Sequence, residues 1–428
     1  MNKMLSKQEA LTKAAKGLKV AIVGGSIAGC ATAIELSRAG CDVVVYERTV
    51  DGLQDRGAAI GMPASMSEML QMRDLVDTDW AHIPVSKKSY IRPLHEGEEG
   101  DQGEHILGEL SQSLRVTNWG VLYDNLRRRV PDDIYHQGQQ VMALDELADG
   151  SVRLHLADGQ ADLFDLAIFA DGYHSLGRQL LFPDLSLEYT GYIAWRGVIA
   201  EAFVSDIQPF EGRMRMVVSP AGHCLLGMMP SRQHEVETGK RRLNWLFYVK
   251  VAETDLSTVL TDKRGRTHQA SVPPGAVPKA QVVDLQRTAR RHLPGYIADV
   301  ICNTPEPFIQ AIFDMWVPCY HRGRVCLIGD AAMLARPHTG RGATKAITDA
   351  IALADALTTH QSVDTALAAW DKGQRSAGET LVTLGQSLGR ALVTEAPDWQ
   401  RIDDTAWQAW WAVISGTRGA TLPTTWRT

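Results

Sequence analysis

The fold of this 428-residue chain is decided by residues 18–48, which read LKVAIVGGSIAGCATAIELSRAGCDVVVYER. Lys19–Val23 is a short apolar run that predicts a buried strand, and Gly24–Gly29 predicts a tight turn. Apolar residues at helical spacing predict a helix over Ile27–Ala39, and a second buried strand follows over Cys41–Tyr46. A strand, a glycine-rich turn, a helix and a second strand in this order predict a unit that binds a dinucleotide.

Each part of this unit can hold one part of a dinucleotide, although the unit by itself suits FAD as well as NAD(P). The helix N-terminus offers free N–H groups and the positive end of the helix dipole to a pyrophosphate. Gly24 makes the turn, Gly29 lets the helix pack closely on the strand, and Glu47, 18 residues after Gly29, can accept hydrogen bonds from a ribose. Ser26 replaces the middle glycine of the GxGxxG pattern and is small enough to let a phosphate approach. The expected cofactor-binding residues of the unit are Gly24, Ser26, Ile27, Ala28, Gly29, Glu47 and Arg48.

The composition is that of an ordinary globular protein, with 45% hydrophobic and 22% charged residues. The length predicts two domains and an extension, and the net charge of −6 argues against nucleic acid as a partner. The six cysteines include no CxxC pair, which predicts buried reduced thiols and no metal site. Residues 1–17 lack the apolar core of a secretory signal, and no apolar run is long enough to span a membrane. We therefore expect a cytoplasmic protein.

Two further buried strands are predicted to join the sheet of the dinucleotide unit. One covers Asp165–Ala170, and the other lies within Gly323–Ala332 with Asp330 at its carboxyl end. Ligands bind at the carboxyl ends of strands in open α/β sheets, so Asp330 is a candidate ligand-binding residue. Gly340 and Gly342, which precede a predicted helix over 343–357, let the backbone approach a ring closely. The alternative is that these glycines only make a structural turn.

From about residue 186 the sequence changes to β-rich runs separated by turn residues. These runs are Leu187–Ala200, Met214–Ser219, His223–Met229 and Leu243–Val251, which predict an antiparallel sheet in a second domain. The segment after residue 360 is predicted to be helical. Trp407, Trp410 and Trp411 form one helical stripe there, which we expect to pack on the nucleotide domain or on a second subunit.

Three segments resemble one family, the single-component FAD-dependent aromatic hydroxylases, or class A flavoprotein monooxygenases of the p-hydroxybenzoate hydroxylase fold. The GGSIAG turn with Glu47-Arg48 resembles the ADP-binding fingerprint of that family. Residues 169–175, FADGYHS, resemble its DG motif, which is linked to FAD and nicotinamide handling. Residues 329–342, from GDAA through Pro337 to Gly342, resemble its GD motif, whose aspartate holds the flavin ribitol. The resemblance spans roughly residues 18–358.

Finer details resemble the 2,6-dihydroxypyridine 3-monooxygenase branch of the family. They are the segments Tyr192–Gly197, Thr117–Trp119 and Arg336–His338, together with Lys345-Ala346. Residues 223–230 read HCLLGMMP, where that branch is expected to have a Tyr-Pro pair, and Met333 follows GDAA in place of His or Asn. We therefore expect a substrate pocket that differs from that of the branch.

The resemblance implies an α/β fold with a Rossmann-like FAD-binding domain, an inserted, mainly antiparallel β-sheet substrate domain and a C-terminal helical extension. The FAD-binding domain is expected to be discontinuous, over 18–85, 112–185 and 305–360. The substrate domain is expected over 86–111 and 186–304, and the C-terminal helical region over 361–428.

The resemblance also implies a reaction. NADPH or NADH reduces FAD, O2 adds to give a flavin C4a-hydroperoxide, and a hydroxyl group is transferred to an electron-rich aromatic ring. The expected substrate is a small hydroxypyridine-like or phenolic compound. A second copy of the chain, in a homodimer, is one of the partners considered.

The candidate substrate and catalytic residues each have a structural alternative. Trp195 and Trp245 could stack against the substrate ring or lie in the core. His223 and His338 could help to deprotonate a ring hydroxyl or be structural histidines. Arg341 could stabilise anionic reduced flavin or point to solvent.

Two arginines and the two later motifs complete the expected FAD site. Arg56 could reach a phosphate or ribose, or be a solvated surface residue. Arg115, where a helix through Leu126 is predicted to begin, is also expected at the cofactor. The resemblance adds Asp171, Asp330, Pro337, Gly340 and Gly342 to the cofactor-binding residues.

Other functions fit the sequence less well. A flavin reductase or halogenase on the same scaffold is one alternative, but the WxWxIP pattern of flavin halogenases is absent. A non-catalytic FAD-binding protein is another. A plain NAD-dependent dehydrogenase fits the first 48 residues but leaves the strand before Asp330 unexplained.

Overall fold

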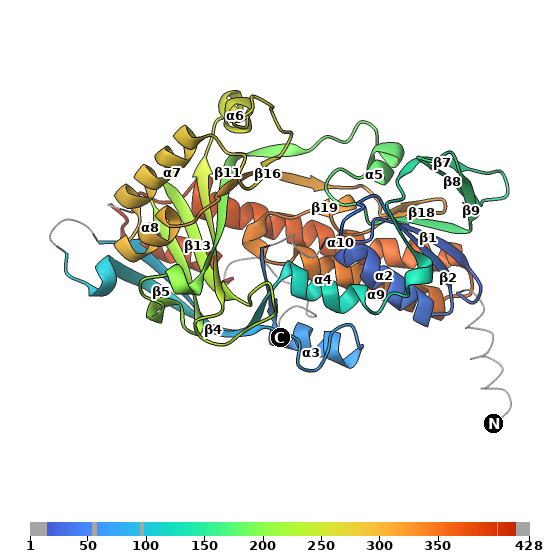
Figure 1. The fold of residues 1–428 in the computed structure, drawn as a ribbon, viewed down its shortest axis with the longest axis horizontal. Coiled ribbons are helices and arrows are strands. Elements are labelled where there is room, and N and C mark those ends of the chain that lie inside the picture. The colour runs from blue at the N-terminus through green and yellow to red at the C-terminus, as the bar shows by residue number, and fades with distance from the viewer. Residues whose placement is uncertain (1–14, 54–57, 95–97, 400, 417–428) are drawn as a thin grey trace.

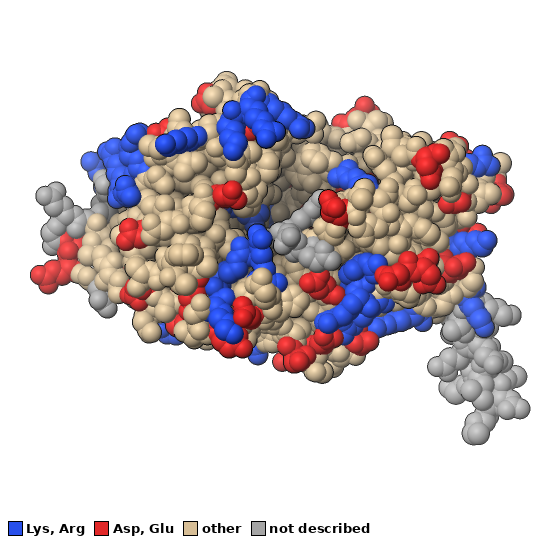
Figure 2. All heavy atoms as spheres, viewed as in Figure 1, with Lys and Arg blue, Asp and Glu red and all other residues tan. Residues whose placement is uncertain are grey.

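A computed structural model describes residues 15–53, 58–94, 98–399 and 401–416. Two large sheets form the two ends of the molecule, and α10 (Val363–Gly389) lies between them (Figure 1). The surface is hollowed between the two ends (Figure 2). Within the described ranges no helix is both long enough and apolar enough to cross a membrane.

The first sheet is the predicted Rossmann-like sheet, with the strand order β17-β18-β10-β1-β2-β6. Its pairs are parallel except for β17 with β18. The central strands are apolar along their length because helices cover both faces of a parallel sheet. The four strands predicted from the sequence are confirmed at its centre. The strands are β1 (Lys19–Val23), β2 (Asp42–Glu47), β6 (Tyr135–Gln137), β10 (Leu166–Phe169), β17 (His321–Arg322) and β18 (Val325–Leu327).

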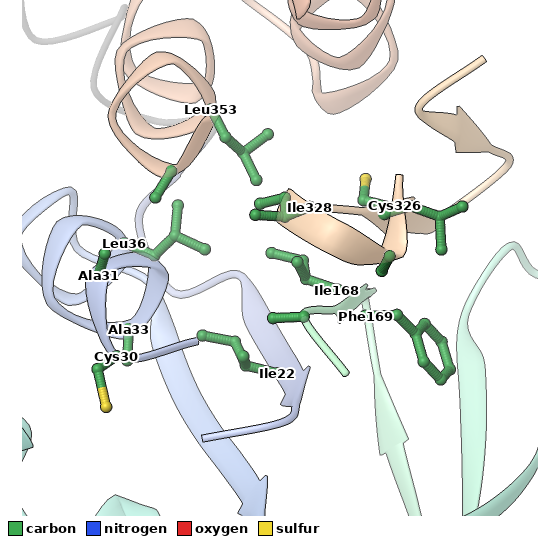
Figure 3. Packing of buried hydrophobic residues seen from close by; sticks show 14 of the residues in the cluster. Ile22, Cys30, Ala31, Ala33, Leu36, Ile168, Phe169, Cys326, Ile328 and Leu353 are labelled. Carbon is green, nitrogen blue, oxygen red and sulfur yellow. The ribbon is translucent and has the colours of Figure 1, made fainter. Parts of the chain in front are cut away.

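Helices α2 (Ile27–Arg38) and α9 (Gly342–Thr359) pack on this sheet. Figure 3 shows Ile22 and Ile168 of the strands facing Leu36 of α2 and Leu353 of α9. All four side chains are fully buried, and the burial of each contributes about 1.5–3 kcal/mol to stability. This shared core holds the N-termini of both helices at the same edge of the sheet.

The second sheet has the strand order β15-β16-β11-β14-β13-β12-β4-β5-β3, and β19 pairs with β16. Its neighbours are antiparallel except for β4 with β12, so the predicted antiparallel domain is confirmed. The strands are β3 (Ala59–Pro63), β4 (Ile83–Pro93), β5 (Glu104–Asn118), β11 (Glu188–Ala200), β12 (Arg213–Ser219), β13 (Gly222–Met229), β14 (Arg242–Lys250), β15 (Ser271–Val272), β16 (Phe308–Trp316) and β19 (Met333–Leu334).

The two faces of the second sheet bury different sets of residues because side chains alternate along each strand. Trp195, Trp245 and Phe247 lie on the outer face, in a core shared with α7 (Lys279–His292) and α8 (Gly295–Cys302). Tyr192 and Tyr248 lie on the inner face, in a core shared with the C-terminal segment. The inner face is the one that adjoins the Rossmann-like sheet.

The segment around Arg115 differs from its prediction. Arg115 lies inside β5, and the helix α4 (Trp119–Arg127) begins only after Asn118, whose side chain accepts the N–H of Val121 at 2.8 Å. Leu114 and Val116 pair with β4 as well as β3, so strand pairing on both sides overrides the helical pattern. The smaller elements are α3 (Ala64–Met72), α5 (Leu176–Leu181), α6 (Glu253–Val259) and a small sheet of β7 (Val141–Glu146), β8 (Val152–Leu156) and β9 (Ala161–Phe164).

The C-terminal segment continues from α10 through a π-helix over Arg390–Thr394 to α11 (Asp404–Ile414). Trp410 of α11 is buried against Tyr90 of β4, with ring centroids 5.7 Å apart, and its indole N–H donates to Ala391 O at 2.9 Å. The predicted burial of the tryptophan stripe within the chain is confirmed for Trp410, while Trp407 and Trp411 are only half-buried against the same core. Its partner is the second sheet, which corrects the expectation that it packs on the nucleotide domain.

Candidate active site

A cleft of about 710 Å³ lies between the Rossmann-like sheet and the second sheet. Its walls are the turn after β1, the DG segment, the segment after Asp330 and residues 310–313 of β16. The three motifs that are far apart in the sequence therefore meet around one cavity, at the hollow visible in Figure 2.

The turn after β1 requires glycine at two positions. A Cβ on Gly24 would lie 2.6 Å from Ala170 O, and one on Gly29 would lie 1.8 Å from Gly24 O. Gly24 also has φ +100°, a conformation that other residues rarely adopt. These contacts hold the N-terminus of α2 against the sheet, where Ser26, Ile27 and Ala28 line the cleft.

Glu47 ends β2 at the cleft and orders the turn beside it. One carboxylate oxygen accepts the N–H of Gly25 and the other accepts the N–H of Thr49, both at 2.8 Å. Each carboxylate oxygen can accept more than one hydrogen bond, so Glu47 retains capacity for a ribose hydroxyl. Arg48 also lines the cleft.

Asp171 brings a buried carboxyl to the cleft at the end of β10. Its Oδ2 accepts the N–H of Leu176 at 2.7 Å, while no described residue pairs with its Oδ1. Burial raises the pKa of this carboxyl. A buried oxygen without a partner costs free energy, so this atom is suited to receive a ligand donor or a water.

Asp330 lies in the short helix Gly329–Ala331 at the carboxyl end of β18, as predicted. Its side chain is exposed at the wall of the cleft. The surrounding protein still desolvates the carboxyl and raises its pKa to about 6. The backbone at Asp330 is held by Arg178, whose Nη1 donates to Asp330 O and Ala331 O, each at 3.2 Å.

Arg178 was not expected from the sequence. It lies on α5 and also donates to Tyr173 O, so it joins the DG segment to the segment of Asp330. The signal available in the sequence was its position seven residues after Asp171, on a helix that starts immediately after the DG segment. Only the tertiary structure shows which carbonyl groups it reaches.

Gly340, Arg341 and Gly342 lie where α9 begins, opposite the turn of β1. Gly340 has φ +63°, which favours glycine, and Gly342 starts the helix. All three residues line the cleft. Burial lowers the pKa of Arg341. Burial, together with the nearby charge of Arg341, lowers the pKa of Lys88 on β4 to about 8. The α9 N-terminus and these cations make this end of the cleft electropositive.

Behind that end of the cleft, His338, Tyr248 and His223 form a stack on the inner face of the second sheet. The ring centroids of His338 and Tyr248 are 4.1 Å apart, and those of Tyr248 and His223 are 5.8 Å apart with nearly parallel planes. His338 lies between Pro337 and Thr339, which both line the cleft. The stack thus extends from the cleft wall into the core.

The two histidines are neutral at ordinary pH. Burial lowers the pKa of His223 to about 3, and burial together with the charges of His223 and Arg336 lowers the pKa of His338 well below its usual value. A group that holds a proton this poorly is a weak general base. The lowered pKa values disfavour the expectation that either histidine deprotonates the substrate, and they favour neutral rings that donate and accept hydrogen bonds.

Comparisons with known proteins agree with this geometry. The family models that match are an FAD binding domain-like model at residues 189–314, an FAD binding domain model at 309–382 and an NAD(P)-binding Rossmann-like model at 22–51. The aurachin C monooxygenase/isomerase of Stigmatella aurantiaca is 30% identical over 371 residues, which cover 82% of this chain and 84% of that protein. This chain belongs to the class A FAD-dependent monooxygenases.

A second relative and a solved structure point to one branch of these monooxygenases. The 2,6-dihydroxypyridine 3-monooxygenase of Paenarthrobacter nicotinovorans is 29% identical over 377 residues, which cover 87% of this chain and 91% of that protein. The structure of 2,6-dihydroxypyridine-3-hydroxylase from Arthrobacter nicotinovorans superposes with a TM-score of 0.81, at 28% identity over 89% of this chain and 94% of that one. The predicted family and fold are confirmed.

The cleft of this monooxygenase fits FAD. The glycines exclude side chains where α2 begins, Asp330 is exposed inside the cleft, and Asp171 has an oxygen without a partner among the described residues. Glu47 and Gly342 line one and the same cavity, as a bound dinucleotide requires.

Of the two arginines predicted at the cofactor, the structure describes only Arg115. Arg56 lies outside the described residues. Arg115 is not among the residues that line the cleft, and its Nη1 donates to Leu114 O at 3.4 Å. Its position in β5 follows from the strand pairing given above, and its role at the cofactor stays a prediction.

The two predicted stacking tryptophans are structural. Trp245 is fully buried on the outer face, where its indole N–H donates to the Thr304 hydroxyl at 2.8 Å. Trp195 lies in the same outer core. Strand alternation turns both away from the flavin cleft, which corrects the expectation that they stack on the substrate.

Proposed function

We propose that this monooxygenase uses NADPH or NADH and O2 to hydroxylate a small hydroxypyridine-like or phenolic ring. The observation that carries the proposal is the position of the inner sheet face: Gln310 and Ile312 of β16 line the same cleft as Gly340 and Gly342 of the predicted flavin motif. A planar ring held there would lie between the cofactor and the second sheet. Relatives include enzymes named for 2,6-dihydroxypyridine and for 6-hydroxynicotinate.

The residues that would hold FAD follow the length of the cleft. Glu47 would bind the ribose of the ADP half, and the N-terminus of α2, at Ser26 to Ala28, would bind the pyrophosphate. Asp330 would accept a hydroxyl of the ribityl chain. Residues 337–342 would pack beside the flavin ring, with the α9 N-terminus at its polar edge.

When bound, FAD supplies the redox chemistry and the activation of oxygen, and the chain supplies binding, orientation and a dry site. Arg341 and the α9 N-terminus would stabilise negative charge on the reduced cofactor. The inner face of the second sheet, closed by the C-terminal segment at Leu392 and Trp410, would keep water away from the reacting ring. The neutral histidines would orient the substrate through hydrogen bonds.

The test is a screen of NAD(P)H oxidation by the FAD-bound protein against hydroxypyridines and phenols, with the product mass measured. We expect slow oxidation alone, stimulation by a substrate, and a product heavier by one oxygen atom. Stimulation with peroxide as the only product across all compounds would show an effector in place of a substrate. A yellow protein whose NAD(P)H oxidation no aromatic compound stimulates would contradict the proposal and favour a reductase or a non-catalytic flavoprotein.

A cytoplasmic location is part of this proposal. All six cysteines are free, as expected in a reducing compartment, and five of them lie in or beside buried strands and helices of the core. The cleft is formed by residues of one chain. The expected homodimer is tested separately, by measuring the molecular mass in solution.

A further inference from the structure

Both backbone polar groups of Gly25, in the turn after β1, are held by side chains. The Gly25 N–H donates to Glu47 at 2.8 Å. The Gly25 carbonyl accepts from the Tyr135 hydroxyl at 3.0 Å and from the Cys30 thiol, whose Sγ lies 3.2 Å away. Gly25, Cys30 and Tyr135 are all buried. The carbonyl of Gly25 therefore points into the core beneath the turn.

The direction of this carbonyl fixes the direction of the next N–H in the chain. The described residues contain no cis peptide bond, and in a planar trans peptide the C=O and N–H groups point in opposite directions. Since the Gly25 carbonyl points into the core, the Ser26 N–H points out of it. Ser26 lines the cleft. No described residue accepts the Ser26 N–H, so this donor is available to a ligand in the cleft.

We propose that Tyr135 is a positioning residue for the FAD pyrophosphate. Its hydroxyl, supported by the Cys30 thiol, holds the Gly25 carbonyl in the core and thereby turns the Ser26 N–H toward the pyrophosphate. This inference rests on the placement of the pyrophosphate at the α2 N-terminus, which is part of the proposed function. Without the two donors, the peptide between Gly25 and Ser26 is free to rotate, because glycine tolerates most backbone conformations. Such a rotation turns a carbonyl oxygen, in place of an N–H, toward the phosphates.

The Rossmann-like sheet brings Tyr135 and Glu47 to the same turn. β6 runs parallel to β2, with Tyr135 opposite Val45 and Gln137 opposite Glu47. Side chains alternate along a strand, and paired residues of neighbouring strands point to the same face of the sheet. Tyr135 and Glu47 therefore share one face, where one binds the carbonyl of Gly25 and the other its N–H.

The neighbours of Tyr135 fix its ring and the direction of its hydroxyl hydrogen. The Arg127 guanidinium lies over the ring, 3.9 Å from its centroid. A carbonyl can only accept, so the Tyr135 hydroxyl gives its hydrogen to Gly25 and accepts from the Tyr123 hydroxyl, 3.4 Å away. Burial raises the pKa of Tyr135, so this hydroxyl stays protonated and remains a donor.

The contact with Tyr135 also accounts for a glycine that the dinucleotide pattern does not require. In the GxGxxG pattern, Gly24 and Gly29 occupy glycine positions, whereas Gly25 occupies a position open to any residue. A Cβ on Gly25 would lie 2.2 Å from the Tyr135 hydroxyl oxygen. Gly25 is therefore fitted to Tyr135, and the two residues act as a pair.

The test measures the FAD affinity of the full-length protein by flavin fluorescence and the phosphorus NMR spectrum of the bound cofactor. Tyr135→Phe should weaken FAD binding by about five- to tenfold, as the loss of one buried hydrogen bond predicts. The phosphorus resonances of bound FAD should also shift, because the Ser26 N–H no longer faces the pyrophosphate. Cys30→Ala should have a smaller effect, because a thiol is a weak donor. Cys30→Ser keeps a donor and should bind FAD as the wild type does.

The matched control, Tyr189→Phe, separates positioning from a structural role. The Tyr189 hydroxyl also donates to a backbone carbonyl at 3.0 Å, that of Val251, but Tyr189 lies on β11 of the second sheet. Loss of either hydroxyl should lower the melting temperature of the FAD-free protein by a similar amount. The rise in melting temperature on adding FAD depends on FAD affinity, so it should shrink only in Tyr135→Phe.

The outcomes distinguish this inference from the proposed function. Unchanged FAD affinity and phosphorus resonances in Tyr135→Phe would overturn the positioning role, and so would an equal loss of affinity in Tyr189→Phe. If Tyr135→Phe does not fold, equal FAD affinities and equal spectra in Cys30→Ala and Cys30→Ser would overturn it. If Tyr135→Phe behaves as expected but no aromatic compound is hydroxylated, the inference stands and the hydroxylase proposal fails. If the wild type does not bind FAD, both fail.

Discussion

Asp349 accepts the backbone N–H of Gly329 at 3.2 Å, which ties the middle of α9 to the turn that presents Asp330. Asp349 is itself paired with Lys345 one helical turn earlier, and each side chain of the pair is 1% exposed. The Nζ atom of Lys345 also lies 3.4 Å from the Tyr320 hydroxyl. A buried pair of this kind is weak evidence for stability by itself, but it fixes the turn in front of the cofactor.

Removing one partner of the pair should damage both stability and FAD binding. Asp349→Ala leaves the Lys345 charge buried and unpaired, which we expect to cost about 3–5 kcal/mol of unfolding free energy. Replacing both, as Lys345→Met with Asp349→Leu, should recover most of that stability. FAD affinity of the double variant should stay low because the Gly329 N–H has lost its acceptor. Equal recovery of stability and FAD affinity would show that the pair has no positioning role.

The Asp330 carboxyl predicts a pH-dependent affinity for FAD. Its pKa in the FAD-free protein is raised to about 6, above its ordinary value, so folding favours the protonated form. Its contribution to stability is therefore present at low pH and is lost as the pH rises through about 6. A ribityl hydroxyl donates to the ionised form, so FAD affinity should rise between about pH 5 and pH 7.

Asp330→Asn tests this assignment. The variant should bind FAD more weakly at neutral pH, and the rise in affinity with pH should be absent. Asp284→Ala, an exposed aspartate on α7, is the control and should bind FAD as the wild type does. A pH profile that is the same in wild type and Asp330→Asn would assign the titration to another group.

Arg341→Gln should make the bound flavin harder to reduce. Arg341 lines the cleft at the α9 N-terminus, where a fixed positive charge stabilises the anionic reduced form. At about 1 kcal/mol of lost stabilisation, the two-electron potential should fall by about 20 mV. Redox titration of both proteins with FAD bound measures the change. An unchanged potential would mean that the Arg341 guanidinium does not act on the flavin ring, and Arg287→Gln on the outer helix α7 controls for net charge.

Two helical glycines should respond to alanine in opposite directions. A Cβ on Gly29 of α2 would lie 1.8 Å from Gly24 O, so Gly29→Ala must displace the helix from the turn. That variant should lose FAD binding and melt at a lower temperature. A Cβ on Gly373 of α10 would meet nothing within 4 Å, so Gly373→Ala should stabilise the protein by about 0.5–1 kcal/mol. Thermal melts with and without FAD measure both effects.

The sequence by itself determined the elements whose signals are local. The apolar run at Lys19–Val23, the glycine turn and the helical spacing that follows lie within a few residues of one another, and the structure has them at the predicted positions. The same holds for the strand before Asp330 and for the four long runs of the second sheet. Where two pairing strands competed with a helical pattern, as at Arg115, the local signal failed.

The tertiary structure decided which side chains share a site. Alternation along β11 shows that Tyr192 and Trp195 face opposite ways, but only the packing of α7, α8 and the C-terminal segment decides which face meets the cleft. The contact of His223 with Tyr248 depends on the register of β13 with β14, and its contact with His338 depends on docking two sheets. The reach of Arg178 to Asp330 depends on the same docking. Burial then set the charge of these histidines, because a pKa depends on the surroundings that the whole fold creates.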